Sequence, residues 1–121
     1  MIKKSIKKIV LGSLVLPLVL GTAFAAYPDK PIKMLVGYAP GSSTDIVGRM
    51  VANELSIALK QSVIVENRGG AAGSLAADAV AKSTPDGYTV LFAQNGLAIN
   101  VAANPRLPFN GQKDLLPVVG V

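Results

Sequence analysis

The sequence predicts an α/β protein, with a parallel βαβαβ sheet and flanking helices. Two observations support this prediction. Three short apolar segments, rich in β-branched residues, alternate with longer segments in which apolar residues recur every three or four positions. A loop of glycine or small polar residues follows each of the short segments. This alternation is typical of parallel strands that are joined by right-handed helical crossovers.

Residues 1–25 have the three parts of a secretory signal peptide. Four lysines precede a nearly continuous apolar stretch, residues 9–20, and Ala23-Phe24-Ala25 places small residues at the two positions that signal peptidase recognises. We therefore expect cleavage after Ala25 and a periplasmic mature protein. The alternative is an uncleaved membrane anchor, although the apolar stretch is shorter than the ~20 residues that a span needs.

The composition of the chain excludes several classes of function. It has 12 Lys and Arg, 7 Asp and Glu and a net charge of +5, but four of the lysines belong to the predicted signal peptide. The remainder is therefore nearly neutral, and a nucleic-acid partner is not indicated. Because the chain has neither cysteine nor histidine, a Cys/His metal site and a nucleophile activated by histidine are excluded within it. We expect no catalytic residue, no metal site and no cofactor.

The first strand is expected at residues 32–36, a mostly apolar run. It leads into the first loop, residues 37–45, in which Pro40-Gly41 permits a sharp turn and Ser42 or Ser43 can cap the helix that follows. Such a loop leaves backbone N–H groups pointing outward. It is therefore either an anion-binding site or an ordinary, well-capped turn.

Two residues of the first loop have open roles. Asp45 lies in the first turn of the expected helix, where the helix dipole favours a carboxylate. Its carboxylate either serves that dipole or accepts a hydrogen bond from a hydroxyl or amino group of a ligand. Tyr38 either packs at the edge of the core or lines a pocket, and its spacing does not distinguish the two.

The first helix is expected at residues 44–60, because apolar residues recur there at spacings of three and four. These residues are Ile46, Val47, Met50, Val51, Leu55, Ala58 and Leu59. The polar residues that fall mostly between them should face water, namely Arg49, Asn53, Glu54 and Lys60. A second strand follows at residues 62–66, and its three consecutive β-branched residues, 63–65, predict that both of its faces are covered.

A second, glycine-rich loop at residues 67–73 leads to a helix at residues 74–82. Its glycines either approach a ligand or only permit close packing of helix and sheet. The helix has a narrow apolar stripe made of Leu75, Ala76, Ala79 and Val80.

The third strand is expected at residues 88–93, after the turn signal at 85–87. A third loop, Gln94-Asn95-Gly96, follows it, and its amides are either ligand contacts or turn residues. We expect one or two helical turns at residues 97–103, irregular structure at 107–111 and the start of a fourth strand at 115–121. Ligand sites of parallel sheets lie beyond the carboxyl ends of the strands, so the three loops should gather on one edge.

Four motifs occur here in a fixed order. They are YP-x-KPI at 27–32, PGSSTD at 40–45, VENR-x-GAAG at 65–73 and A-x-S-x-PDGYT at 81–89. With these motifs, residues 27–121 closely resemble the N-terminal part of the periplasmic tripartite tricarboxylate receptor family, also called the Bug-type extracytoplasmic solute receptors. The resemblance implies a receptor of two α/β lobes, with the type II periplasmic-binding-protein-like fold, that closes on a small organic carboxylate.

The resemblance also implies which residues bind the ligand. In the first loop these are Ala39, Gly41, Ser42, Ser43, Thr44 and Asp45. In the second loop they are Asn67, Arg68, Gly69, Gly70, Ala71 and Gly73, and in the third loop Gln94, Asn95 and Gly96. Members of the family deliver their ligand to membrane subunits of a tripartite transporter and are not enzymes. Family members often carry glycine where Ser42 stands and proline where Gly69 stands.

A receptor of two lobes needs two domains of ~100–150 residues. Residues 26–121 are therefore expected to form part of the N-terminal lobe. The sequence therefore predicts a solute receptor, or a truncated form of one. Two alternatives stay open, a non-binding gene fragment of such a receptor and a small enzyme that acts on a phosphate ester.

The predicted signal peptide determines the residue at which the mature protein should begin. Because small residues at Ala23 and Ala25 match the specificity of signal peptidase, the periplasmic form should begin at Ala26. N-terminal sequencing of periplasmic material measures this. A membrane-bound product with an intact Met1 end would contradict cleavage.

Overall fold

The computed structural model describes residues 26–121, and the predicted signal peptide, residues 1–25, lies outside the described residues. The elements are β1 (Ile32–Val36), α1 (Ser43–Leu59), β2 (Val63–Asn67), a short 3₁₀ turn (Ala71–Gly73), α2 (Ser74–Ala81), β3 (Thr89–Phe92) and α3 (Asn95–Ala103). The predicted order of strands and helices is confirmed. No helix within this described part is both long and apolar enough to cross a membrane.

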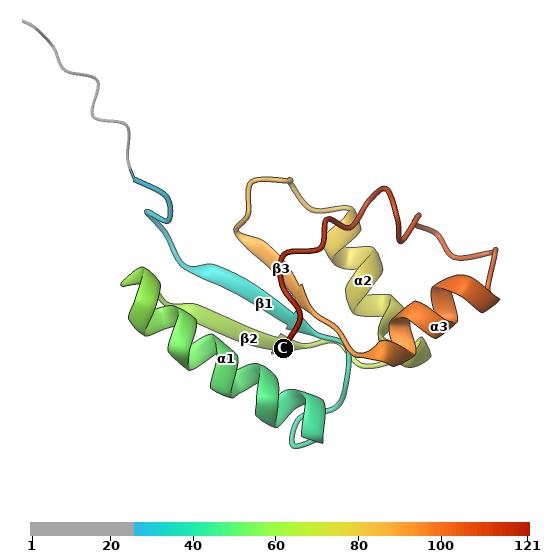
Figure 1. Cartoon of the computed structure of the whole chain (residues 1–121), viewed down its shortest axis with the longest axis horizontal. Coiled ribbons are helices and arrows are strands. Elements are labelled where there is room, and N and C mark those ends of the chain that lie inside the picture. Colours follow the sequence, from blue (N-terminus) through green and yellow to red (C-terminus); the bar gives the residue numbers. More distant parts are fainter. Residues whose placement is uncertain (1–25) are drawn as a thin grey trace, which may run out of the picture.

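The three strands form a parallel sheet in the order β2-β1-β3. The chain moves from β1 to one neighbour through α1, and then back across β1 to the other neighbour through α2. Right-handed crossovers in opposite directions place their helices on opposite faces of a sheet. Figure 1 shows this arrangement, with α1 below the sheet and α2 and α3 above it. The predicted α/β fold class is thereby confirmed.

The core lies around the central strand, where Leu35 and Val36 are fully buried. On one face α1 comes close, because a Cβ atom at Gly48 would lie only 3.2 Å from side-chain atoms of both Val36 and Phe92. On the other face, buried side chains of α2, α3 and the C-terminal segment pack against partly buried neighbours such as Leu91. The buried members of this cluster are Ala77, Leu97 and Phe109.

The predicted facing of α1 is wrong, although the helix itself is confirmed. The side chains that the helix buries are small or polar, namely Thr44, Asp45, Gly48 and Ala52. Large apolar side chains point outward instead, with exposed fractions of 53% for Ile46 and 64% for Met50. The sheet is approached so closely at Gly48 that only small side chains fit beneath the helix.

Two further burial predictions are corrected. Ile64 of β2 is 56% exposed, so this strand is not covered on both faces. The reason is that α2 packs over β3 and β1 and leaves the corresponding face of β2 open. In α2 itself Ala76 is buried and Ala79 and Val80 are half-buried, as predicted, but Leu75 is exposed and Ala77 is buried in its place.

The predicted fourth strand at residues 115–121 does not form. Leu116 and Val118 in this segment are 89% and 87% exposed. A strand needs hydrogen bonds to a neighbouring strand, and none of the three described strands pairs with this segment. Pro117 also removes one of the N–H donors that such pairing would use.

The segment before β1 is fixed to the turn before β3, at the amino ends of the strands. The Tyr27 hydroxyl donates to the Gly87 carbonyl at 2.8 Å, and the Tyr88 hydroxyl donates to the Asp29 carboxylate. This second bond lowers the pKa of Asp29 and raises that of Tyr88. Lys30 lies over the Tyr88 ring, 4.2 Å from its centroid. Both segments belong to motifs that the sequence singled out, and their role is to hold this end of the sheet, away from the three loops.

Candidate functional site

The three loops gather at the carboxyl ends of the strands, as the sequence predicted. The first and second loops cross at Gly37 and Gly73, where a Cβ atom on Gly37 would lie 2.6 Å from the Cα atom of Gly73. Such contact of backbone with backbone leaves no room for a side chain. The third loop reaches the same place, because a Cβ atom on Gly96 would lie 3.0 Å from the Tyr38 hydroxyl.

The first loop turns sharply into α1. Gly41 has φ +81°, a conformation that residues with a side chain rarely adopt. Ser42 is the N-cap of α1, and its hydroxyl accepts the Asp45 N–H at 3.2 Å while its carbonyl accepts the Ile46 N–H at 2.9 Å. The predicted cap is confirmed at Ser42.

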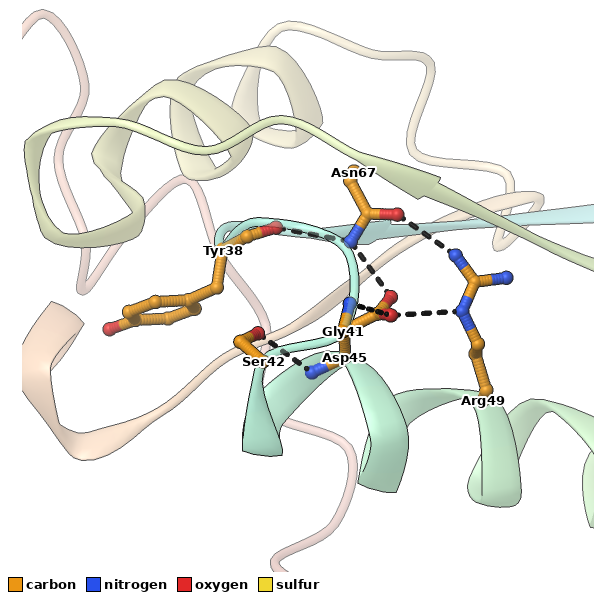
Figure 2. A network of polar contacts seen from close by, with 6 residues as sticks. All are labelled: Tyr38, Gly41, Ser42, Asp45, Arg49 and Asn67. Carbon is orange, nitrogen blue, oxygen red and sulfur yellow. Dashed lines mark hydrogen bonds and ion pairs between the residues drawn. The ribbon is translucent and has the colours of Figure 1, made fainter.

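The carboxylate of Asp45 connects three parts of the protein, and the residue is only 3% exposed. One carboxylate oxygen accepts the Gly41 N–H at 2.8 Å and the Arg49 Nε–H at 3.0 Å, as Figure 2 shows. The other accepts a side-chain N–H of Asn67 at 2.8 Å. A buried carboxylate is tolerated only with such compensation.

Asn67, at the end of β2, completes this network. Its side-chain nitrogen also donates to the Tyr38 carbonyl at 3.0 Å, and its side-chain oxygen accepts from Arg49 at 3.0 Å. We call these five residues, Tyr38, Gly41, Asp45, Arg49 and Asn67, the Asp45 network. It joins the first loop, α1 and β2 through charge-assisted and neutral hydrogen bonds.

The network lowers the pKa of Asp45 from its ordinary value of 3.8 to about 2. The main cause is the hydrogen bond from Arg49, followed by those from Gly41 and Asn67, since each favours the charged form. Arg49 was expected to face water, and its side chain is 51% exposed, but it was not predicted to belong to the site. The i, i+4 spacing from Asp45 is the signal that identifies the pair.

The network also determines which backbone N–H groups between Gly41 and Asp45 have a hydrogen-bond acceptor and which do not. Those of Gly41 and Asp45 have acceptors within the loop, and that of Ser42 donates to the Ala39 carbonyl at 3.2 Å. Within the part of the chain that the structure describes, the N–H groups of Ser43 and Thr44 have no acceptor, as expected for the first turn of a helix. An anion at this helix end would meet these two donors and the positive end of the helix dipole.

The second loop is strained. Four consecutive residues, Gly70–Gly73, have positive φ, and two of them are alanines, with φ of 48° at Ala71 and 51° at Ala72. Asn100 of α3 holds this conformation, since its side-chain nitrogen donates to the Ala71 carbonyl at 3.1 Å and to the Ser74 hydroxyl at 2.6 Å. Asn100 was not among the residues predicted from the sequence. Strain of this kind persists only where surrounding contacts impose it.

Not every predicted site residue faces the gathered loops with its side chain. The Arg68 guanidinium pairs with Glu66 at 2.8 Å and, with Lys33, lowers the pKa of that carboxyl group. The backbone N–H of Arg68 donates to the Val36 carbonyl and so extends the pairing of β1 and β2. Gln94 and Asn95 are exposed, and the Gln94 side chain makes no cap bond to α3.

Of the remaining predicted residues, Ala39, Gly69 and Gly70 lie in the gathered loops, whereas Gly96, which was predicted to be in a loop, lies in the first turn of α3. A Cβ atom on Gly69 would lie 3.5 Å from the Ala39 nitrogen, so the first two loops also touch here. Among residues 26–121, no group of three or more carboxylate side chains is placed to hold a metal ion. The arrangement is chemically suited to bind an anion through backbone N–H groups.

Residues 47–121 match the sequence profile of the tripartite tricarboxylate transporter family receptors. Protein BugT of Bordetella pertussis is 44% identical over 94 residues, which cover 76% of this chain and 29% of BugT. The chain thus spans less than a third of the length of the curated relatives it matches.

Solved structures of periplasmic binding proteins are similar in fold and sequence. BugD is 43% identical, with a TM-score of 0.52 over 54% of this chain and 22% of BugD. MatC from Rhodopseudomonas palustris, solved with bound malate, is 36% identical, with a TM-score of 0.63 over 73% of this chain and 30% of MatC.

Because Ala72 in the second loop has positive φ, its replacement by glycine should stabilise the protein, whereas such a replacement usually destabilises a protein. Ala72→Gly should raise the free energy of unfolding by up to about 1 kcal/mol, because glycine has no Cβ penalty at positive φ. Urea unfolding measures the change. Ala58→Gly, at an exposed position in the last turn of α1, is the control and should lower stability, by up to about 1 kcal/mol. A loss of stability in both variants would show that Ala72 is not strained.

The low pKa of Asp45 predicts a dependence of stability on acid. The pKa is lower in the folded state, about 2 against an ordinary 3.8, so the ionised group stabilises the fold above pH 3.8. This contribution is lost as the pH falls through about 2. Thermal unfolding between pH 7 and pH 2 should show a larger loss in the parent than in Asp45→Asn, whose amide does not titrate. The same pH profile for both proteins would refute the assignment.

Proposed function

The chain belongs to the tripartite tricarboxylate transporter receptor family, and from that premise we propose that it captures a small organic carboxylate in the periplasm for the membrane subunits of a tripartite transporter. The family is one of substrate-binding receptors and not of enzymes. The proposal is supported chiefly by the N-terminal end of α1. There the backbone N–H groups of Ser43 and Thr44 have no acceptor among the described residues, and they lie at the edge on which all three loops gather.

The geometry of the first loop supports a carboxylate as the ligand group. The two open donors are backbone N–H groups at a helix N-terminus, an arrangement that favours a compact anion. The Asp45 carboxylate is already bonded to three donors, so its proposed role is to position the loop. Asn67 has the same positioning role from β2, through the Tyr38 carbonyl and Asp45.

The second and third loops complete the proposed site. Gly69 of the second loop lies against Ala39 of the first loop, Gly70, Ala71 and Gly73 belong to the same second loop, and Gly96 leaves room for the Tyr38 hydroxyl. The Arg68 guanidinium stays with Glu66 in this proposal. Support for a carboxylate also comes from MatC, which shares 36% identity and was solved with malate.

We further propose that residues 26–121 form part of the N-terminal lobe and that a second lobe covers the bound anion. The matched structures are consistent with this, because this chain covers only 22% of BugD and 30% of MatC. With one side of the anion open to water, its contacts are screened and individually weak. Residues 26–121 alone should therefore bind carboxylates weakly, and enclosure should strengthen the same contacts.

Nuclear magnetic resonance titration tests the proposed site even at weak affinity. Succinate added to residues 26–121 should shift the backbone amide signals of Ser43 and Thr44 more than those of Lys30 and Asp86, at the opposite end of the sheet. Sodium chloride at matched ionic strength is the control. No shift at Ser43 and Thr44 with succinate or citrate would overturn the proposal.

Two substitutions in the first loop should differ in their effect on binding. Gly41→Val places a β-branched residue at φ +81° and should weaken succinate binding by about 10-fold or more, because the turn no longer presents the helix end. Ser42→Ala removes the N-cap and should cost about 1 kcal/mol of stability with only a modest effect on affinity. Equal affinities for Gly41→Val and the parent would place the ligand elsewhere.

A further inference from the structure

Tyr38 lies where the three loops meet. Its ring is next to Gly73 of the second loop, with a ring carbon 3.6 Å from the position that a Cβ atom there would take. Its hydroxyl is 3.0 Å from the corresponding position on Gly96, at the start of α3. In Figure 2 the ring points away from Asp45 and Arg49, toward the ribbon of α3. At Gly73 this distance is an ordinary contact, whereas at Gly96 a side chain would crowd the hydroxyl, so the glycine at position 96 leaves the space that the hydroxyl occupies.

The backbone and the side chain of Tyr38 have different roles. The backbone carbonyl accepts a hydrogen bond from Asn67 and so belongs to the Asp45 network. The hydroxyl has no hydrogen-bond partner among residues 26–121, and the residue is half-buried. A phenol can both donate and accept, and its rigid ring places that group with little loss of side-chain freedom.

We propose that Tyr38 is a specificity-determining residue, whose hydroxyl donates a hydrogen bond to a second acceptor on the ligand. This inference rests on the proposed function, in which the first carboxylate of the ligand lies at Ser43 and Thr44. The ligand class that satisfies both contacts is a dicarboxylate, or a carboxylate with a second oxygen acceptor. A neutral phenol brings a hydrogen-bond donor but no net charge, so its contribution depends on where the acceptor of the ligand lies.

Tyr38→Phe tests this role, because it keeps the ring between the glycines and removes only the hydroxyl. Succinate and butyrate are matched in carbon number, and only succinate has the second carboxylate. Dissociation constants from amide shifts should rise about 3- to 10-fold for succinate in the variant, the effect of one hydrogen bond, and stay unchanged for butyrate. Tyr88→Phe, at the other end of the sheet, should leave both constants unchanged.

A second substitution perturbs the same hydroxyl without altering Tyr38. Gly96→Ala adds a methyl carbon 3.0 Å from the hydroxyl and should displace it, so it should reproduce the selective loss for succinate. Amide spectra of both variants establish that the fold is retained.

The possible outcomes separate the two proposals. If Tyr38→Phe binds succinate as the parent does, while succinate still shifts Ser43 and Thr44, Tyr38 has only a packing role and the proposed function stands. Equal losses for succinate and butyrate would also overturn the inference, because they indicate a general disturbance of the loops. If neither ligand shifts Ser43 and Thr44 in the parent, both proposals fall.

Discussion

The negative charge of a buried carboxylate must be balanced by hydrogen-bond donors. At Asp45 this requirement determines how the first loop, α1 and β2 are arranged at one edge of the sheet. Asp45 is almost closed to water, and its three donors come from the first loop, from the next turn of α1 and from the end of β2. Removing any one of them would leave part of the charge unsatisfied, which is costly in a protein interior. The turn into α1, the rotation of that helix and its distance from β2 are therefore set together.

The same requirement determines which backbone N–H groups of the first loop and of the first turn of α1 are used within the protein and which have no acceptor among the described residues. The Asp45 network uses the N–H of Gly41, while the capping hydroxyl of Ser42 takes the N–H of Asp45. What remains at the start of α1 is the pair of N–H groups on Ser43 and Thr44. The ionised side chain of Asp45 thus fixes the conformation of the first loop. The strained alanines of the second loop and the close crossing of Gly37 and Gly73 hold the neighbouring loop against it.

The sequence was informative where local chemistry decides the outcome. The alternation of segments predicted the βαβαβ order, and residue type predicted a serine cap at Ser42 or Ser43, which the structure places at Ser42. The gathering of the loops followed from the parallel connection of the strands. In contrast, the facing of α1 depends on how near the sheet lies at Gly48, a tertiary property that hydrophobicity does not encode. Asn100 was missed because its partners, Ala71 and Ser74, lie on other elements, whereas Arg49 was missed although its i, i+4 spacing from Asp45 is visible in the sequence. The fourth strand was predicted from apolar side chains alone, and none of the three described strands pairs with that segment.

A double-mutant cycle between Asp45 and Asn67 tests most directly whether this network is the element on which the site depends. The free energy of unfolding would be measured at neutral pH for Asp45→Ala, Asn67→Ala and the double variant. Residues that share one hydrogen-bond network show non-additive effects. The account predicts that the double variant is clearly less destabilised than the sum of the single variants, since either change already breaks the link between α1 and β2. Additive effects within experimental error would contradict it.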